Sequence, residues 1–199
     1  MRLTITTNVS VDGVMQGLGG PEEDRRDGFT RGGWALPLFD AEVEELLGRV
    51  YQRADAFLFG RWTFEVFAGS WGQVADAGTS LIADALNSRP KYVVSTALAE
   101  PGWAGTTVLP DVEAIRALRD APGGELQVHG SLSLARWLLD NQLADEITLF
   151  TYPVVIGQGM RLFPADGADA ALELVESRAA ANGVTVQVYR PAGRPRYAH

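Results

Sequence analysis

Hydrophobic and polar residues alternate from Leu3 to Val11, which is the pattern of a half-buried β-strand. The alternation stops at Asp12-Gly13, a dipeptide typical of tight turns. From Asp40 onward the apolar residues instead recur every three to four positions, as on one face of an α-helix. These recurring residues are Val43, Leu46, Leu47, Val50 and Tyr51. The pattern therefore predicts a strand, an intervening stretch and then an amphipathic helix.

Short apolar runs and helical patterns alternate along the rest of the chain. Strands are predicted over 56–60, 91–95, 106–109, 125–130 and 145–157. Helices are predicted from about Arg61, over roughly 80–87, over 111–120 and over 134–143. The segments 172–177 and 183–191 flank a turn at Asn182-Gly183 and form a hairpin. This order predicts an α/β fold with three layers, a mostly parallel mixed sheet and an antiparallel C-terminal hairpin.

The chain shows no internal repeat, low-complexity block or linker. We therefore expect one domain over 1–193 and a flexible tail over 194–199, after Pro191 and Gly193. The Gly-rich stretch from Gly17 to Gly33 is too long for an ordinary connection. Such a loop is usually either a functional lid or disordered.

Composition narrows the possible functions of the chain, which has 199 residues and 46% apolar character. A net charge of −8, from 25 acidic and 17 basic residues, argues against a nucleic-acid partner, which requires a basic surface. The absence of cysteine excludes disulfides, thiolate metal sites and cysteine nucleophiles. With His129 and His199 as the only histidines, no metal site is expected. No apolar run reaches bilayer length and no signal-peptide core is visible, so we expect a cytoplasmic protein without a membrane partner.

Three predicted strand ends carry residues suited to binding an anion: Phe59–Thr63, Val94–Thr96 and Val128–Ser133. In open α/β sheets, ligands bind beyond the carboxyl ends of parallel strands, where helix N-termini present free N–H groups. Three such ends suit a ligand with several phosphates, such as a dinucleotide. The alternative at each end is an ordinary helix cap, and Arg61 could pair with a surface carboxylate. No GxGxxG motif follows the first strand.

Taken in order, several motifs resemble those of a known family. They are VSVDGVMQG, FLFGRWTFEVF, KYVVSTAL, LQVHGSLSLARWLL and LADEITLFTYPVVIGQGMRLF, followed by the final hairpin. They resemble the dihydrofolate reductase-like reductases grouped with the C-terminal reductase domain of the bacterial bifunctional riboflavin-biosynthesis deaminase-reductase. The resemblance extends from about Leu3 to Pro191 and implies a dihydrofolate reductase-like fold and NADPH as cofactor, and it is compatible with a homodimer.

The resemblance also implies roles for particular residues at the three strand ends. Gly60, Arg61 and Thr63 match the segment that holds the cofactor phosphates, and Ser95 and Thr96 match the segment near the adenosine 2′-phosphate. Gly130, Ser131 and Leu132 match the turn beneath the pyrophosphate. Where dihydrofolate reductases have two glycines joined by a cis peptide, this chain has His129-Gly130, which puts the cis bond in question. The loop from Val14 to about Trp34 corresponds to a mobile lid.

A carboxylate on the first helix contacts the substrate in such reductases. Asp40 lies nearest the centre of the apolar helix face and is the first candidate proton donor. Its alternative role is that of a helix N-cap. Glu44 lies at the border of that face and fits the family spacing from Gly60 better, so the choice between the two stays open.

The substrate pocket is predicted to contain Trp34 and Phe39 together with Phe64 and Thr151, although aromatic residues are equally typical of a core. His129 is more often structural than catalytic at such a position. The pair Asp145-Glu146, at the start of a strand, suggests sheet-edge or dimer contacts.

The leading hypothesis is an NADPH-dependent reductase that transfers hydride to a small pterin-like, aminopyrimidine-like or carbonyl substrate. The alternative is a non-catalytic cofactor- or metabolite-binding module on the same fold. A riboflavin-pathway reductase is a third possibility. Because Lys91 is the single lysine, its ribosyl-phosphate clamp would need an arginine such as Arg31 or Arg161. The sequence does not identify the substrate.

Overall fold

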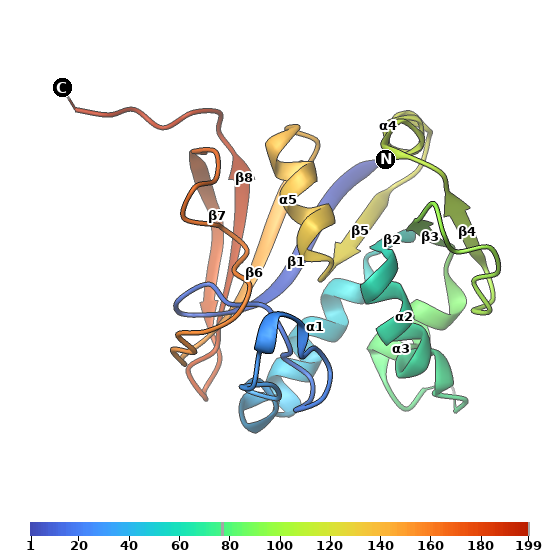
Figure 1. Cartoon of the computed structure of the whole chain (residues 1–199), viewed down its shortest axis with the longest axis horizontal. Helices are drawn as coiled ribbons and strands as arrows, with labels where there is room; N and C mark the ends of the chain where they lie inside the picture. Colours follow the sequence, from blue (N-terminus) through green and yellow to red (C-terminus); the bar gives the residue numbers. More distant parts are fainter. Residues whose placement is uncertain (77, 199) are drawn as a thin grey trace.

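The computed structural model of the chain describes residues 1–76 and 78–198 (Figure 1). It contains one eight-stranded sheet with the strand order β4-β3-β2-β5-β1-β6-β8-β7. The strands are β1 (Arg2–Ser10), β2 (Ala56–Gly60), β3 (Lys91–Val94), β4 (Thr106–Leu109), β5 (Glu125–His129), β6 (Glu146–Tyr152), β7 (Leu172–Ala179) and β8 (Thr185–Pro191). The first six are parallel, whereas β8 runs antiparallel to both β6 and β7. The predicted mixed sheet and antiparallel hairpin are confirmed.

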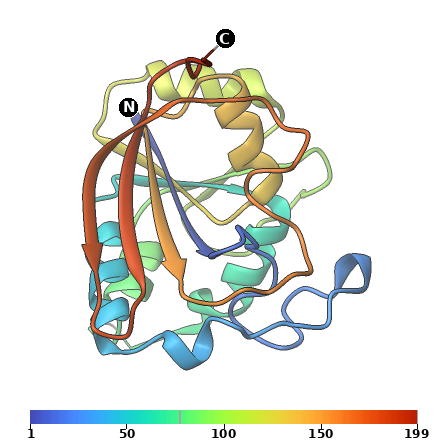
Figure 2. The same ribbon diagram turned by 90° about the vertical axis from the view of Figure 1, so that its left-hand side faces the viewer.

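Helices cover both faces of this sheet. They are α1 (Ala41–Gln52), α2 (Arg61–Gly69), α3 (Leu81–Ser88), α4 (Val112–Asp120) and α5 (Leu132–Asp140). One apolar cluster joins α4 and α5 to the strands through residues such as Ile115 and Leu138. A second cluster joins α1, α2 and α3 to the opposite face through residues such as Val43, Phe64 and Leu86. The three-layer architecture is therefore confirmed (Figure 2).

Capping residues explain where two of the helices begin. The side chain of Asp40 accepts a hydrogen bond from the Val43 N–H at 3.0 Å, and α1 follows. Asp111 does the same for Ala114 at the start of α4. A carboxylate at this position satisfies a backbone donor that has no partner within the helix. The sequence predicted both starts to within one residue.

Strand β6 ends at Tyr152, five residues before the predicted end at 157. Pro153 follows it and has no N–H to donate to a sheet ladder, so the apolar run continues outside the sheet. The carboxylate of Asp12 instead accepts hydrogen bonds from the N–H groups of Ile156 and Gly157, at 2.9 and 2.8 Å. Burial tends to raise the pKa of Asp12, but these bonds and those from Ser10 and Arg161 outweigh it and lower the pKa.

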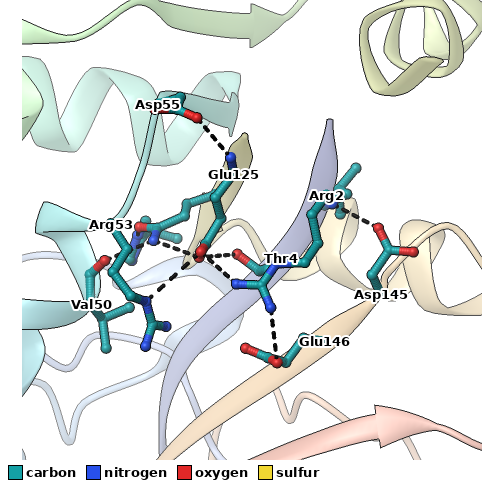
Figure 3. A network of polar contacts seen from close by, with 11 residues as sticks. Arg2, Thr4, Val50, Arg53, Asp55, Glu125, Asp145 and Glu146 are labelled. Carbon is teal, nitrogen blue, oxygen red and sulfur yellow. Dashed lines mark hydrogen bonds and ion pairs between the residues drawn. The ribbon is translucent and has the colours of Figure 1, made fainter. Parts of the chain in front are cut away.

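The sheet-edge expectation for Asp145-Glu146 is corrected by the strand order, because β6 lies inside the sheet, whereas the dimer contacts stay a prediction. Asp145 accepts a hydrogen bond from the Leu3 N–H and pairs with Arg119, each at 2.8 Å. Glu146 pairs with Arg2 at 3.2 Å. Both carboxylates therefore belong to an intramolecular network at the amino ends of the central strands (Figure 3).

The C-terminal segment after β8 makes polar contacts with the residues before β7, where the backbone of Ala171 bonds to Ala192 and Gly193. Arg194 pairs with Asp169 at 2.7 Å, and the Tyr197 hydroxyl donates to the same carboxylate at 2.8 Å. His199 lies outside the described residues. Across residues 1–76 and 78–198, no helix is long and apolar enough to cross a membrane.

Candidate functional site

A cavity of about 380 Å³ lies at the carboxyl ends of the central strands. Its walls come from the ends of β1 and β5, from α1 and α2, and from the loop that follows β1. The volume falls within the usual range for small-molecule pockets, roughly 300–1,000 Å³. Apolar and aromatic side chains on these walls include Met15, Leu18, Phe39, Leu47, Tyr51, Trp62, Val66, Phe67, Trp71, Ile82 and Tyr152. The location is the one expected for a ligand in an open α/β sheet.

Two strand-to-helix corners are joined beside this cavity. The Gly60 N–H donates to Ser131 Oγ at 2.8 Å, and the Ser131 N–H donates to Thr63 Oγ1 at 2.9 Å. These two bonds connect the start of α2 to the start of α5. Neither helix has a side-chain cap, so the first N–H groups of both remain available to a ligand. Free N–H groups and the positive ends of two helix dipoles favour an anion here.

Backbone strain marks the second of these corners. Gly130 and Ser131 have φ values of +57° and +53°, a region that side chains other than glycine rarely adopt. A Cβ at Gly130 would lie 3.2 Å from Thr63 Cγ2, so this position favours glycine for space as well as for φ. The turn therefore uses Gly130-Ser131, and His129 is the last residue of β5 rather than the first of the turn. No peptide bond in the described ranges is cis.

The residues predicted to bind the cofactor divide into two groups. Thr63, Gly130, Ser131 and Leu132 line the cavity, and Gly60 is bonded to Ser131. The other three are Arg61, Ser95 and Thr96, which lie outside the cavity walls.

Each residue of the second group has another contact or faces solvent. Arg61 is exposed and pairs with Glu65 at 3.4 Å, which was the alternative expected from the sequence. The hydroxyl of Ser95 accepts hydrogen bonds from the Ala97 and Leu98 N–H groups, and Thr96 is exposed. Ser95 nevertheless follows β3, which lies beside β2, so all three corners share one edge of the sheet. The cofactor-binding roles themselves stay predictions.

The carboxylates proposed on the first helix do not line the cavity. Asp40 is the N-cap of α1, and its second oxygen accepts a hydrogen bond from the Asn182 side chain at 2.9 Å. Glu44 is exposed to solvent. The helix turns Leu47 and Tyr51 toward the cavity instead, because apolar residues direct its buried face. The catalytic role predicted for Asp40 or Glu44 therefore lacks a place in the cavity.

The carboxylates that do line the cavity are Glu23 and Asp24, both in the loop after β1. Asp24 is buried and makes a two-point contact with the guanidinium of Arg26, with one N···O distance of 2.8 Å. Burial tends to raise the pKa of Asp24, but bonds from Arg26 and Gln16 outweigh this and lower it. Burial raises the pKa of the Glu23 carboxyl, and the neighbouring Asp24 charge adds to that effect. Neighbouring carboxylates therefore have opposite tendencies to hold a proton.

The loop reaches across the cavity to the start of α2. The guanidinium of Arg26 lies 4.5 Å from the centre of the Trp62 ring, and both residues line the cavity. Near the loop start, Gln16 donates to Asp24 and to the Arg26 carbonyl, at 3.2 and 3.0 Å. Phe29 is buried in a small apolar cluster with Val14 and Ile156. The sequence allowed this loop to be either a functional lid or disordered. In the structure it is packed over the site.

Only one of the four predicted substrate residues lines the cavity, and this is Phe39. Phe64 is 1% exposed and packs in the core against Phe59 and Trp103, because α2 turns it toward the sheet. Thr151 is a β6 residue paired with strand β8, away from the cavity walls. Trp34 supports the site from outside: its indole N–H donates to the Gln16 carbonyl at 2.8 Å, and its ring packs on Tyr152. Substrate roles for these residues stay predictions.

Comparison with known proteins identifies the family. The RibD C-terminal domain family matches residues 2–186 of this chain. The chain belongs to this family. It is 26% identical to the uncharacterized protein YyaP of Bacillus subtilis (strain 168), over 94% of each chain.

Solved structures similar to this member of the RibD C-terminal domain family confirm its fold. A putative riboflavin biosynthesis protein from Shewanella sp. PV-4 has a TM-score of 0.64 at 19% identity, over 96% of this chain and 99% of that one. Dihydrofolate reductase from Enterococcus faecalis, complexed with NADP(H) and RAB-propyl, has a TM-score of 0.62 at 15% identity, over 96% of each. A pyrimidine reductase-like protein from Corynebacterium diphtheriae has 0.60 at 16%, over 96% and 91%. The fold of this chain is dihydrofolate reductase-like.

The structure adds cavity residues that the sequence pattern did not reveal: Asn8, Gln16, Glu23, Asp24, Tyr51 and Tyr152. Asn8 alternates with apolar residues on the first strand, and that signal could have placed its side chain on one sheet face. Glu23 and Asp24 lie in an irregular loop, where no periodicity shows which side chain points inward. For the loop residues of this RibD C-terminal domain, only the tertiary structure shows which side chains point into the cavity.

Proposed function

We propose that this protein is an NADPH-dependent reductase acting on a small heterocyclic or carbonyl substrate. The observation that carries the proposal is the cavity beside two joined, uncapped helix N-termini at the carboxyl edge of a dihydrofolate reductase-like sheet. Such N-termini suit the phosphates of a dinucleotide, and the adjoining apolar cavity suits flat rings. Family membership and the fold shared with an NADP(H)-complexed reductase support this combination.

The residues at the two corners fit a dinucleotide. The N–H groups at the starts of α2 and α5 would hold its phosphates, with Thr63 and Ser131 keeping the two corners together. Gly130 leaves the space that a side chain would occupy. Arg61, whose present ion pair with Glu65 is exposed, and the Ser95-Thr96 corner would favour the additional 2′-phosphate of NADPH. When bound, NADPH supplies a hydride.

Glu23 is the proposed acid for the proton that a reduced C=N or C=O bond requires. It lines the cavity, and its raised pKa favours the protonated form that a general acid needs. Asp24 is bound to Arg26 and holds its negative charge, which helps keep Glu23 protonated. Asn8 and the Tyr152 hydroxyl, which are 3.3 Å apart, are neutral polar groups available to orient a substrate.

Two alternatives make different predictions. A non-catalytic binding module is favoured by the absence of the α1 carboxylates from the cavity walls, and it would bind cofactor without turnover.

For a riboflavin-pathway reductase, Arg31 or Arg161 was expected to clamp a ribosyl phosphate. Arg31 donates to the Ile156 carbonyl and Arg161 pairs with Asp12 at 3.2 Å, and neither lines the cavity. These contacts weigh against that substrate.

Tryptophan fluorescence provides the test of cofactor binding, because Trp62 and Trp71 line the cavity. We expect saturable quenching by NADPH, with affinity at least roughly tenfold higher than for NADH, since a 2′-phosphate adds charge-assisted hydrogen bonds. Absence of saturable NADPH binding would remove the proposal. Oxidation of NADPH with a panel of pterins, aminopyrimidines and carbonyl compounds then separates the reductase from the binding module. Saturable binding without oxidation of NADPH by any compound would favour the module.

A further inference from the structure

A chain of buried polar side chains runs along one face of β5 and ends at the cavity. Glu125, Gln127 and His129 alternate along this strand, so their side chains share one face. Gln127 is fully buried and His129 is 2% exposed. The chain begins in the ion-pair network at the amino ends of the strands, where Glu125 contacts Arg2 at 2.6 Å (Figure 3). It leads to His129, which lines the cavity at the opposite end of the strand.

The contacts of Gln127 fix the orientation of its amide. Its Nε2 lies 2.7 Å from the Val50 carbonyl oxygen and 2.7 Å from Glu125 Oε1. Neither oxygen has a proton to donate when Glu125 is ionised. Burial tends to raise the pKa of Glu125, but bonds from Arg2, Gln127 and Thr4 outweigh it and lower the pKa. The atom facing these two acceptors must therefore be the amide nitrogen.

This orientation decides which nitrogen of His129 carries the proton. Gln127 Oε1 lies 2.8 Å from His129 Nε2 and can only accept a hydrogen bond. Nε2 must therefore be the N–H. Burial lowers the pKa of His129 to about 3, so the ring is neutral near pH 7. In a neutral ring with a proton on Nε2, Nδ1 has a free lone pair.

The surroundings of the ring leave its Nδ1 edge for a ligand. Tyr51 stacks on one side, with 3.7 Å between ring centres, and Phe57 packs against the ring at 5.7 Å. Within the described ranges, His129 Nδ1 has no hydrogen-bond partner. The buried side-chain atoms that have neither a partner nor accessible surface are Ser80 Oγ and Thr106 Oγ1. Because Nδ1 is not one of them, it keeps some accessible surface. An acceptor with no partner among the described residues thus belongs to a side chain that lines the cavity.

We propose that His129 determines ligand specificity: its Nδ1 accepts a hydrogen bond from an N–H group of the ligand, and Glu125 and Gln127 are positioning residues that hold the ring in this tautomer. A ligand with a carbonyl oxygen at the same place would face a lone pair and bind poorly. The ligand side of this proposal rests on the proposed function. The N–H donor belongs either to the carboxamide of the cofactor or to a substrate ring of aminopyrimidine type.

The tautomer is tested without any ligand. In long-range proton–nitrogen NMR spectra, protonated and unprotonated imidazole nitrogens appear in well-separated regions. The chain has only two histidines, so a His199→Ala variant assigns the signals of His129. We expect Nε2 to be protonated and Nδ1 unprotonated across pH 5 to 8. A protonated Nδ1 would overturn the proposal.

Two pairs of probes then distinguish the sources of the N–H. The first pair is NADPH and its 3-acetylpyridine analogue, in which a methyl group replaces the amide nitrogen. The second pair is 2-amino-4-hydroxypyrimidine and unsubstituted pyrimidine. We expect the N–H-bearing member of one pair to shift the Nδ1 resonance and its partner to leave it in place. If no N–H-bearing probe shifts Nδ1, the acceptor role is wrong, even where fluorescence shows that NADPH binds.

The variant His129→Phe tests the energetic contribution while keeping a flat ring against Tyr51. It should weaken binding of the effective N–H-bearing probe by roughly five- to tenfold, as expected for one neutral hydrogen bond. Binding of the matched probe without the N–H should not weaken, which separates a lost hydrogen bond from general damage to the cavity. In Gln127→Leu the wild-type histidine loses its orienting acceptor, and we expect signals of both tautomers. Equal weakening of both probes by His129→Phe would contradict the proposal.

Discussion

At the scale of single residues, Glu23 and Asp24 show how neighbouring carboxylates acquire different properties. Both line the cavity, but only Asp24 has a guanidinium partner. The pKa of Asp24 is lowered despite burial, whereas burial and the Asp24 charge raise the pKa of Glu23. A proton shared between such neighbours is held by the one that lacks a cationic partner. This division assigns a charge-holding role to Asp24 and the acid role to Glu23.

Replacing Glu23 tests this assignment. We expect Glu23→Gln to lower kcat by roughly 10²-fold or more, because glutamine can donate a hydrogen bond but not a proton. In the wild type, kcat should fall as pH rises through the raised pKa of Glu23, since the acid form is lost there. The measurement is steady-state NADPH oxidation over pH with the best substrate of the panel.

The control for this variant is Glu22→Gln. Glu22 is exposed, pairs with Arg25, and does not line the cavity. We expect its kcat and pH profile to match those of the wild type. A Glu23→Gln enzyme with wild-type kcat would show that the proton comes from another group or from water.

At the scale of elements, the loop after β1 is attached to the body of the protein on two sides. Hydrogen bonds such as those from the Gln158 side chain to the Gly28 carbonyl and from the Met160 N–H to Gln16 Oε1 hold it against the segment after β6. Arg26 connects it to Trp62 on α2, and Gln16 and Asp24 connect its two branches internally. The neighbouring Arg25 is exposed and pairs with the loop residue Glu22. The side of the loop that faces α2 is held through the exposed Arg26, and we expect it to open locally at a lower free energy than the sheet below it.

Arg26→Gln should therefore loosen the loop. A cation–π contact contributes about 0.5–2 kcal/mol, so amide hydrogen exchange within the loop should become roughly twofold to thirtyfold faster. Exchange in β1 and β5 should not change, because their hydrogen bonds do not involve Arg26. Arg25→Gln serves as the matched control and should leave loop exchange near the wild-type rate. Equal effects of the two variants would show that Arg26 does not anchor the loop.

At the scale of the whole molecule, stability and pH are linked through His129. The folded ring has a pKa of about 3, below the ordinary value of 6.5. Below pH 6.5 the unfolded chain therefore binds a proton that the folded chain does not, and stability falls as pH falls. Carboxylates with lowered pKa, such as Asp12, Asp24 and Glu125, add to this loss only near and below pH 4.5. Glu23, with its raised pKa, acts in the opposite direction at mildly acidic pH.

Urea unfolding between pH 7 and 5 measures the contribution of His129. The free energy of unfolding should fall with a limiting slope of about 1.4 kcal/mol per pH unit from this one group. His129→Phe should remove that part of the slope, although its stability at pH 7 also falls because Gln127 loses a hydrogen-bond partner. An unchanged slope in His129→Phe would mean that folding does not lower the pKa of His129.

Much of this architecture could be predicted from residue patterns. The helix that starts after Asp40, the strand over 106–109 and the corner at Gly60 follow from spacing, caps and glycine, which act over a few residues. The end of β6 was predicted too late, because the apolar run continues past Pro153 although the ladder cannot. Thr63, Gly130 and Ser131 come together at the cavity because strand ends of a parallel sheet share one edge.

Local sequence was sufficient for the order of strands and helices, the fold class and two of the three corners, since these depend on periodicity and on backbone preferences over short distances. Which carboxylates line the cavity depends on the tertiary structure: Glu23 and Asp24 line it, whereas Asp40 and Glu44 do not. The tertiary structure also orients His129 through Gln127 and Val50, from a neighbouring strand position and another helix. Side-chain burial, pKa and tautomer depend on partners that are distant in sequence, and no local pattern records those partners.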